Sequence, residues 1–530
     1  MITFDALTLK AFIKENQDFF KGARIQKIQQ PTRRDFIFCL RNFGENRKLY
    51  ININPSLHHI CFMSKNTEEK RRLKIPKQPP MFCMLLRKYL ENSVIKKINQ
   101  PENERIIEFY VETYNELGEQ IYLCLAVELM GKHSNVILYN YDTNIILGCA
   151  HNVGTEKSRE RELAGTLPYS YPPKQNKFDI LKYNGEINYE TLSNDFYMIS
   201  TAFAKLCRGK NIETLHDYIN LKNISPAISG NYAYFSLFFE LIPDGEKQCN
   251  VNDMIDNYFS YYQEKDKYQT LKNHLQNLCR QRLKRTLNSI EKMSSQILRE
   301  ENSEKYRLYG DLIMANLWNG KDYSTTLDVY DYENNENITI ELDERSTLKE
   351  NANKFYKLYN KGKVSRIKLS EQKEELNGIK IWLEHINYSL DMAQNYEALE
   401  EIMPELIEDK DTPSKQKYKA VEPQKIKFDD YTIFIGKNNR QNDYIISKLA
   451  KDDDLWFHTK DCAGSHVLLK GENPSEKIIL ECAKLAKLNS AGGHSSKIGV
   501  IYTKRKYLRK PPKAALGYVT YKNEKEIIID

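Results

Sequence analysis

Several groups of polar side chains in this sequence have the residue types that contact nucleic acid. The first group is the pair Glu104-Arg105, which lies at the start of a strand-like segment. A guanidinium can stack on a base or donate to it, and a carboxylate can accept from an exocyclic amine. A structural ion pair is the alternative interpretation of these two residues, and composition alone favours it.

A second group follows a glycine turn at Gly131. Four possible hydrogen-bond donors stand in a row after it: Lys132, His133, Ser134 and Asn135. Donors of this kind suit phosphate oxygens or base edges. An ordinary glycine turn with polar residues explains the same pattern equally well.

A third group lies in the last hundred residues. The segment 436–443 is dense in amides and cations and poor in apolar residues, so we expect it to contact RNA rather than to be buried. Further along, Trp456 and Phe457 are followed by His458 and Lys460. We expect one of the two aromatic rings to lie in the core, which leaves the other free to stack on a base.

The same hundred residues carry a surplus of positive charge. From Lys425 to the end there are twenty Lys and Arg against thirteen Asp and Glu. The surplus is concentrated between residues 504 and 513, where no acid occurs, at Lys504, Arg505, Lys506, Arg509, Lys510 and Lys513. Such a stretch predicts an edge that contacts phosphates and an RNA affinity that falls with salt.

Signatures of catalysis are missing from the sequence. We find no phosphate-binding GxxxxGK[ST] loop, no HExxH and no GxSxG. Ser465 and His466 are adjacent, but neighbours on a strand point to opposite faces. His458, His466 and His494 lack a thiolate or carboxylate at ligand spacing, which favours structural or RNA-contacting histidines over a metal site. We therefore expect no catalytic residue, no metal and no cofactor.

Composition limits the class of protein. With 530 residues, 28% charged and 41% hydrophobic, the chain predicts several domains. No apolar run approaches the roughly 18–20 residues of a membrane span, and the N-terminus lacks the pattern of a secretory signal. None of the ten cysteines forms a CxxC pair, which is typical of reduced cysteine. We expect a cytoplasmic protein, neither secreted nor embedded in a membrane.

The elements that would position these groups can be read from hydrophobic periodicity. Strands are predicted at 35–40, 105–111 and 134–139, and a helix at 81–90 begins after two prolines. Short helices are predicted at 199–206 and 215–219. The strands predicted in the last hundred residues span 430–436, 464–470, 499–502 and 518–521, with a helix over 475–488.

Two heptad-like seams predict a coiled coil. Residues 268–290 and 376–393 repeat apolar side chains in steps of three and four. Thr347 and Glu350 form a capping box that begins the second helix, and residues 321–342 predict a small strand insert. We expect one antiparallel arm within the chain, and a coil that pairs with a partner is the alternative.

These observations divide the chain as follows: an α+β domain over 1–178, a region of short helices over 179–250, a coiled-coil arm with a tip insert over 254–407, a linker over 408–424 and an α/β module over 425–530.

Five segments, in this order along the chain, resemble the NFACT family. They span residues 79–88, 128–135, 304–310, 436–443 and 454–467. The resemblance implies a multidomain α+β fold: an N-terminal domain like that of formamidopyrimidine-DNA glycosylase, a helix-hairpin-helix region, a long antiparallel coiled coil and a C-terminal NFACT-R domain.

The resemblance also implies a function in ribosome quality control. Such proteins bind the large ribosomal subunit, with its rRNA and a stalled peptidyl-tRNA, and recruit alanine tRNA so that an untemplated alanine tail is added. The ribosome forms the peptide bonds, so the chain would not be an enzyme, and we expect it to act as a monomer away from membranes. A fibronectin-binding surface adhesin, suggested by an older family name, and a general RNA chaperone without tailing are the alternatives.

Site residues carry over by position. The family's Asp-Arg pair, which engages the tRNA anticodon loop, corresponds to Glu104 and Arg105, with a Glu for the Asp. The tRNA-binding residues expected in the N-terminal domain are Glu104, Arg105, Glu128, Met130, Lys132 and His133. The RNA-contacting residues expected in the C-terminal domain are Lys437, Asn438, Asn439, Arg440, His458, Lys460, His466, Lys504, Arg505, Lys506, Arg509 and Lys510.

Two departures from the family narrow these expectations. Met198 stands where family members have a glycine that would approach phosphate, which favours a structural role for that hairpin. Ile2 stands where the glycosylases have their nucleophilic proline, so base-excision chemistry is not expected.

Overall fold

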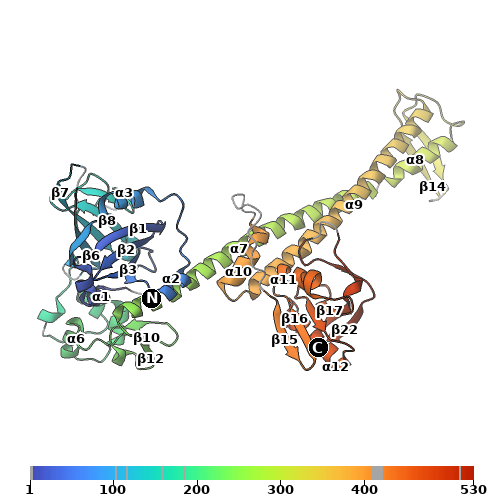
Figure 1. The fold of residues 1–530 in the computed structure, drawn as a ribbon. Coiled ribbons are helices and arrows are strands. Elements are labelled where there is room, and N and C mark those ends of the chain that lie inside the picture. The colour runs from blue at the N-terminus through green and yellow to red at the C-terminus, as the bar shows by residue number, and fades with distance from the viewer. Residues whose placement is uncertain are drawn as a thin grey trace. The chain divides into compact units, whose positions relative to one another are not determined.

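The chain folds into two compact units, Met1–Lys267 and Tyr268–Asp530 (Figure 1). The computed structural model describes residues 4–101, 104–114, 117–156, 160–183, 185–301, 303–332, 334–407, 422–511 and 515–530. Ile2, Lys513 and residues 408–421 of the predicted linker lie outside the described residues.

A nine-stranded antiparallel sheet forms the frame of unit 1, in the order β4-β3-β2-β1-β5-β6-β7-β8-β9. Its strands are β1 (Arg24–Thr32), β2 (Asp35–Asn42), β3 (Glu45–Asn52), β4 (His59–Phe62), β5 (Val94–Asn99), β6 (Ile106–Tyr114), β7 (Gln120–Glu128), β8 (Asn135–Asn140) and β9 (Ile146–Cys149). The three strands predicted for this region are confirmed as β2, β6 and β8.

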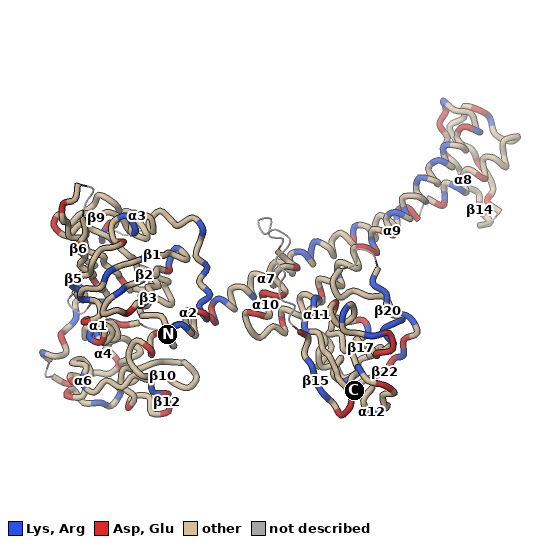
Figure 2. Tube along the Cα trace, viewed as in Figure 1, with Lys and Arg blue, Asp and Glu red and all other residues tan. Residues whose placement is uncertain are grey.

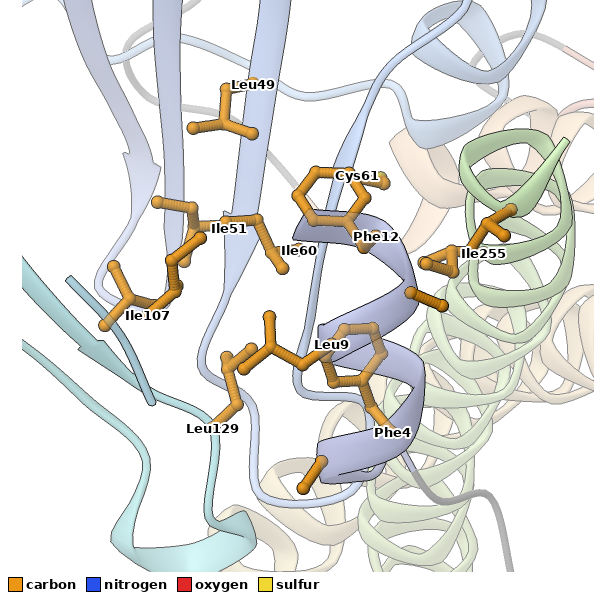
Figure 3. Packing of buried hydrophobic residues seen from close by; sticks show 14 of the residues in the cluster. Phe4, Leu9, Phe12, Leu49, Ile51, Ile60, Cys61, Ile107, Leu129 and Ile255 are labelled. Carbon is orange, nitrogen blue, oxygen red and sulfur yellow. The ribbon is translucent and has the colours of Figure 1, made fainter. Parts of the chain in front are cut away.

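Three helices join this sheet: α1 (Ala6–Phe20), α2 (Lys65–Arg71) and α3 (Met81–Leu90). Helix α1 begins where the Asp5 side chain accepts from the Thr8 backbone N–H at 2.9 Å. Its apolar face meets the sheet, and Figure 3 shows Leu9 of α1 directed toward strand residues such as Ile60. Helix α3 has the predicted bounds.

Residues 179–250 contain more than the predicted helices. The helical elements are η3 (Ile180–Lys182), α4 (Leu192–Asp195), α5 (Thr201–Leu206), α6 (Ile212–Ile219) and η4 (Phe239–Leu241). A small antiparallel sheet, in the order β11-β10-β12, joins them through β10 (Ala227–Ser229), β11 (Phe235–Ser236) and β12 (Gly245–Lys247). Strands of two or three residues are too short to show the alternation by which strands are predicted.

Helices dominate the first part of unit 2. They are α7 (Val251–Glu301, which begins in unit 1), α8 (Glu304–Ala315), α9 (Leu348–Met392) and α10 (Tyr396–Leu406), with the strand pair β13 (Thr326–Asp331) and β14 (Glu336–Glu341). Helix α9 begins with the predicted capping box of Thr347 and Glu350.

The arm is an antiparallel pair within one chain. The Tyr268 hydroxyl donates to the Ala393 carbonyl at 2.6 Å, and Ser365 lies 3.3 Å from the Glu300 carboxylate. Residue numbers therefore rise along α7 as they fall along α9. The apolar seam is buried near one end of the pair and opens along it, because Leu383 and Ile386 are buried whereas Leu287 and Ile379 are exposed.

The C-terminal part of unit 2 is built on a six-stranded sheet in the order β15-β16-β18-β17-β19-β22. Its strands are β15 (Gln424–Phe428), β16 (Tyr431–Ile435), β17 (Leu455–Thr459), β18 (Val467–Lys470), β19 (Ile498–Lys504) and β22 (Lys525–Ile529); β20 (Leu508–Arg509) pairs with β21 (Thr520–Tyr521). The helical elements are α11 (Asn439–Tyr444), η5 (Ile445–Leu449), α12 (Glu476–Leu488) and η6 (Arg505–Tyr507).

All pairs in this larger sheet are antiparallel, so the module is α+β rather than the predicted α/β. Local sequence shows the strands but not their relative direction. Helix α12 packs its buried residues Ile478, Cys482 and Ala486 against the sheet.

Candidate nucleic-acid interface

Glu104 and Arg105 lie at a cavity of about 280 Å³ in unit 1. Four stretches of chain that are distant in the sequence meet there. The lining residues are Asp5, Ala6, Glu104, Arg105, Gln175, Lys177, Ser193, Asn194, Tyr197, Met198, Ile199, Ser200 and Thr201. The structure thus brings the predicted pair together with residues that the sequence alone did not mark as functional.

Backbone contacts hold the pair in place. Gln100 Nε2 bridges the carbonyls of Ala6 and Glu104 at 3.0 and 2.9 Å, and the Leu129 N–H donates to the Arg105 carbonyl at 2.8 Å. Arg105 is half-buried and directly precedes β6, which begins at Ile106. These hydrogen bonds position both residues just before β6, an internal strand of the sheet, where they line the cavity.

Cations of this cavity influence one another. Lys177 donates from Nζ to the Ser193 carbonyl at 2.8 Å. Burial lowers the pKa of Lys177, nearby Arg105 lowers it further, and Glu104 opposes this shift. An anionic or electron-rich ligand in the cavity would therefore relieve the repulsion between Arg105 and Lys177.

The other wall of the cavity is structural. Asp5 accepts from the Thr8 N–H at 2.9 Å in the first turn of α1 and from the Ser200 hydroxyl at 2.6 Å, and Ser200 caps α5. A carboxylate at this position repels phosphate. Met198 is 8% exposed and has a φ of 64°, a left-handed conformation that favours glycine. The glycine-like backbone is retained here although the residue is Met.

Glu128 occupies a buried position instead of the predicted RNA-contacting one. Its side chain has 0% exposure and pairs with Arg161, the Nη2–Oε2 distance being 2.5 Å. The Tyr169 hydroxyl donates to the same carboxylate at 3.0 Å. Burial raises the pKa of the Glu128 carboxyl, and Arg161 opposes the rise. The residue stabilises the fold because its oxygen atoms are directed inward.

The donor row after Gly131 is divided between surface and core. Lys132 and His133 are exposed in η2 (Gly131–His133) and remain candidates, and Met130 before them is half-buried. Ser134 is buried, and the Asn135 amide is occupied by the backbone of His151. The three-residue turn η2 therefore separates the exposed donors from the buried ones.

The amide-rich segment 436–443 is also placed differently from the prediction. Asn438 and Asn439 are each 3% exposed. Asn438 Nδ2 donates to Glu401 of α10 at 2.7 Å, and Asn439 Nδ2 donates to Glu405 at 3.1 Å. These amides hold the module against α10. Lys437, which is exposed, and the half-buried Arg440 are the residues of this segment that retain access to solvent.

His458 and His466 lie inside the C-terminal module. His466 is 2% exposed, and its ring lies edge-on to the rings of Trp456 and His458 at centroid distances of 5.2 Å. Both aromatic residues of the predicted pair, Trp456 and Phe457, are buried. Because these rings are buried, they do not contact the outer surface of an RNA duplex in this geometry.

The predicted basic edge is partly neutralised. Lys504 and Lys506 share Asp453 at 3.0 Å each, and Lys510 pairs with Asp443. Arg505 is half-buried and donates to the Ile446 carbonyl at 3.2 Å. Figure 2 shows Lys and Arg on the chain around β20 and acidic residues on neighbouring stretches of the chain.

Two further residues complete the basic surface. Arg509 is exposed on β20, and Lys460 is exposed but pairs with Glu526 at 2.7 Å. The edge still carries a positive excess, because Asp453 serves two lysines.

Sequence reasoning missed Asp5 and Lys177. Asp5 could have been found, since it directly precedes the apolar-periodic segment of α1 as an N-cap does. Lys177 reaches the cavity on an extended return of the chain that has no periodic pattern. Within the described ranges, no cluster of His, Cys, Asp and Glu can hold a metal ion, and no helix is long and apolar enough to span a membrane.

Comparison with known proteins places the chain in a family. Residues 5–210 and 209–425 match "NFACT N-terminal and middle domains", and residues 423–523 match "NFACT protein RNA binding domain". The chain is 30% identical to "Rqc2 homolog RqcH" of Bacillus subtilis, over 100% of this chain and 98% of that one.

The chain is also similar to a second curated protein and, over part of its length, to a solved structure. A Streptococcus pneumoniae protein with the same name is 28% identical over 99% of this chain and 97% of its own. The solved N-terminal part of a fibronectin/fibrinogen-binding protein from Streptococcus suis is 24% identical, covers 49% of this chain and 100% of that one, and has a TM-score of 0.43. With N-terminal, middle and RNA-binding domains all matched in order, the chain belongs to the NFACT family.

Proposed function

We propose that the chain is a ribosome quality-control factor that binds the large ribosomal subunit carrying a stalled peptidyl-tRNA and recruits alanyl-tRNA for untemplated alanine tailing. The observation that carries this proposal is the similarity, over the whole chain, to proteins named as RqcH. In this role the chain acts in the cytoplasm as a monomer. The ribosome forms the peptide bonds, and the chain supplies binding and orientation.

Arg105 and Glu104 supply the tRNA contact in this proposal. A guanidinium stacks on an unpaired base or donates two hydrogen bonds to it, and a carboxylate accepts from an exocyclic amine. A cavity of about 280 Å³ is too small for a whole anticodon loop, so it would take one splayed-out base at a time. Lys177 adds positive charge beside it.

The C-terminal cations supply binding that does not depend on sequence. Lys437, Arg509 and the lysines that share Asp453 are exposed, so they can approach phosphates. Affinity from such contacts falls linearly with the logarithm of salt concentration. The ion pairs predict a shallower slope than that of six free cations, because Asp443 and Asp453 compete with phosphate.

The test combines RNA sequencing with a tail assay. RNA that co-purifies with the tagged chain should be enriched in large-subunit rRNA and an alanine tRNA, and stalled nascent chains should carry alanine tails. The Arg105→Ala variant should lose the tails and the tRNA but keep the rRNA. Arg33→Ala removes an exposed cation at the β1–β2 turn and should leave all three unchanged.

Other outcomes separate the alternatives. Large-subunit rRNA with a mixed tRNA pool would mean that the Glu at position 104 relaxes selectivity, and Glu104→Asp should then narrow the pool. RNA without tails, even with the unaltered chain, would favour a general RNA chaperone. No RNA above background, with the chain found on the surface of intact cells, would favour an adhesin and refute the proposal.

A further inference from the structure

A cavity of about 400 Å³ opens between α9 and the sheet of the C-terminal module in unit 2. Aromatic rings from both sides line it, and we call it the tryptophan–histidine pocket: Trp382, His385, Trp456, His458 and His466. This volume falls within the range of small-molecule sites, about 300–1,000 Å³. The function proposed above does not use it.

The rings form an ordered wall. Trp456 and His458 are two residues apart on β17, so they project from the same face of the sheet, and their planes are parallel to within 3°. His385 from α9 stacks on His458 at 5.5 Å between centroids, and Tyr521 lies 6.0 Å from Trp456. Trp456 is buried, but Trp382, His385 and His458 are half-buried and Tyr521 is exposed, so these rings are the part of the wall on which a planar ligand can stack.

Three buried nitrogen atoms at this pocket have no hydrogen-bond partner among the described residues. They are Trp456 Nε1, His458 Nε2 and His466 Nδ1. Trp456 and His466 are each 2% exposed, so their rings are almost fully withdrawn from solvent. Native proteins leave few buried polar groups unpaired, and three at one cavity indicate that a ligand supplies the partners.

The charges of the pocket exclude a phosphate as that ligand. Burial lowers the pKa of His458 to about 3 and that of His385 to about 4, so both rings are neutral near pH 7. Among the described lining residues, Lys380 is the one Lys or Arg, and Glu384 lies 3.7 Å from it. Asp461, also on the lining, adds a negative charge. A neutral heterocycle fits these surroundings, and an anion does not.

We propose that the tryptophan–histidine pocket binds a single unpaired nucleobase that carries an exocyclic amine. The Trp456 N–H can only donate, so the ligand must present an acceptor, and the neutral imidazoles can pair with either kind of group. The Asp461 carboxylate accepts from the amine. Adenine, cytosine and guanine meet both conditions, whereas uracil has no amine. Stacking on the aromatic wall holds the base.

This inference rests on the proposed RNA-binding function and deepens it, because the base would come from a single-stranded segment of bound RNA. A free nucleoside has the same chemistry. Cytosine and uracil make the sharpest comparison, since the two pyrimidines are similar in size and differ in the groups that face Asp461.

The experiment titrates the full chain with short single-stranded oligocytidylate and oligouridylate, and with cytidine and uridine. Two of the three tryptophans, Trp382 and Trp456, line the pocket, so their fluorescence reports occupancy. Trp318 is 83% exposed near the end of α8, and Trp318→Phe removes its background. We expect oligocytidylate to quench the fluorescence and to bind about tenfold more tightly than oligouridylate, the effect of about one charge-assisted hydrogen bond.

Two variants test the named contacts. Asp461→Asn removes the charge at a position with a φ of 58°, which Asn tolerates, and should reduce the preference for cytosine about threefold or more. Asp429→Asn is the matched control: it is exposed in the β15–β16 turn with a φ of 51° and should change nothing. Trp456→Phe keeps a ring but removes the N–H, and should weaken binding about three- to tenfold.

The outcomes are distinct. Tighter binding of the oligonucleotide than of cytidine would support the pocket with RNA as the source, and binding of cytidine alone would support it with a free nucleoside. Equal binding of the cytosine and uracil ligands without quenching would overturn the inference about the pocket. If rRNA still co-purified with the chain in that case, the proposed ribosomal function would be unaffected. No binding of any RNA or nucleoside would overturn both.

Discussion

Replacing Glu128 with Gln separates a structural role from an RNA contact. In the structure the two carboxylate oxygens accept from Arg161 Nη1 at 3.0 Å and Nη2 at 2.5 Å, and Tyr169 adds a third bond at 3.0 Å. Glu128 is fully buried, and the Arg161 side chain is 11% exposed. Any effect of this replacement should therefore appear first in stability.

The loss of stability depends on which partners of Arg161 remain after Glu128 is replaced. Removing one partner of a buried ion pair leaves the other charge uncompensated and costs about 3–5 kcal/mol, which we expect for Glu128→Ala. Glu128→Gln keeps the volume and one acceptor, so the expected cost is about 1.5–3 kcal/mol, that of hydrogen bonds to a charged group. Arg161 also donates to the Ser170 carbonyl at 2.8 Å, which limits the loss.

The assay uses the distribution of tryptophan. Trp318, Trp382 and Trp456 all belong to unit 2, so their fluorescence follows that unit, whereas circular dichroism follows both units. In urea, Glu128→Gln should shift the dichroism transition of unit 1 and leave the fluorescence transition unchanged. The double variant Glu128→Gln/Arg161→Gln should lose less stability than the sum of the two single variants, because it leaves no buried charge unpaired at this position.

A normal unfolding curve together with lost tRNA binding would refute this reasoning, because Glu128 would then contact RNA directly. Lys132→Ala and His133→Ala are the controls. Both side chains are exposed, so their unfolding free energies should change by no more than about 0.5 kcal/mol, whatever happens to RNA binding.

Four other changes have defined outcomes. Unit 2 should lose stability on acidification from pH 6.5 to about 4, because burial lowers the pKa of His385 to about 4 and that of His458 to about 3. In this range the unfolded chain binds more protons than the folded chain, and each unit of pKa shift is worth about 1.4 kcal/mol. A urea midpoint that is the same at pH 7 and pH 5 would contradict this prediction. Met198→Gly should be less destabilising than Met198→Ala by about 0.5–1 kcal/mol, because φ is 64° at this position, although both variants lose about 2–5 kcal/mol of apolar packing. Calorimetry compares the melting temperatures of the two variants, and a higher melting temperature for Met198→Ala would contradict this prediction. Asn438→Ala should lower the unfolding free energy measured by fluorescence by about 1–2 kcal/mol, because it removes the N-cap of α11 and the hydrogen bond to Glu401. Lys437→Ala is the control and should leave this free energy unchanged, because the Lys437 side chain is exposed. Gly310→Ala should destabilise the α8–α9 contact by about 1–3 kcal/mol, because its Cβ would lie 2.7 Å from the Tyr356 ring. Gly378→Ala, in open space on α9, should stabilise that helix by about 0.5–1 kcal/mol. Hydrogen exchange in α8 measures the first effect and exchange around residue 378 of α9 measures the second; unchanged exchange in α8 for Gly310→Ala would show that the contact is not rigid.

Local pattern was sufficient for much of the fold. Helix α3 follows from two prolines and an apolar run, and the start of α9 follows from Thr347 and Glu350, because helix caps are decided by a few adjacent residues. The antiparallel arm was also predictable in kind. Its unequal burial was not, since exposure of Leu287 and Ile379 depends on how far apart the two helices run.

The candidate site was predictable only in part, for a physical reason. Arg105 could be named from its match to the family's Asp-Arg pair, but its cavity depends on Lys177 and Ser200, which other elements contribute. Polar composition indicated exposure for Asn438 and Asn439, yet Glu401 and Glu405 supply their partners and make burial favourable.

By itself, then, the sequence determined the family, the main helices and strands and the positive surplus of the last hundred residues, all of which depend on composition and neighbours. The tertiary structure decided which polar side chains face solvent. A buried Glu128 or His466 looks like a surface residue until its surroundings are assembled, because the free energy of burying a polar group is set by partners that the chain brings from far away.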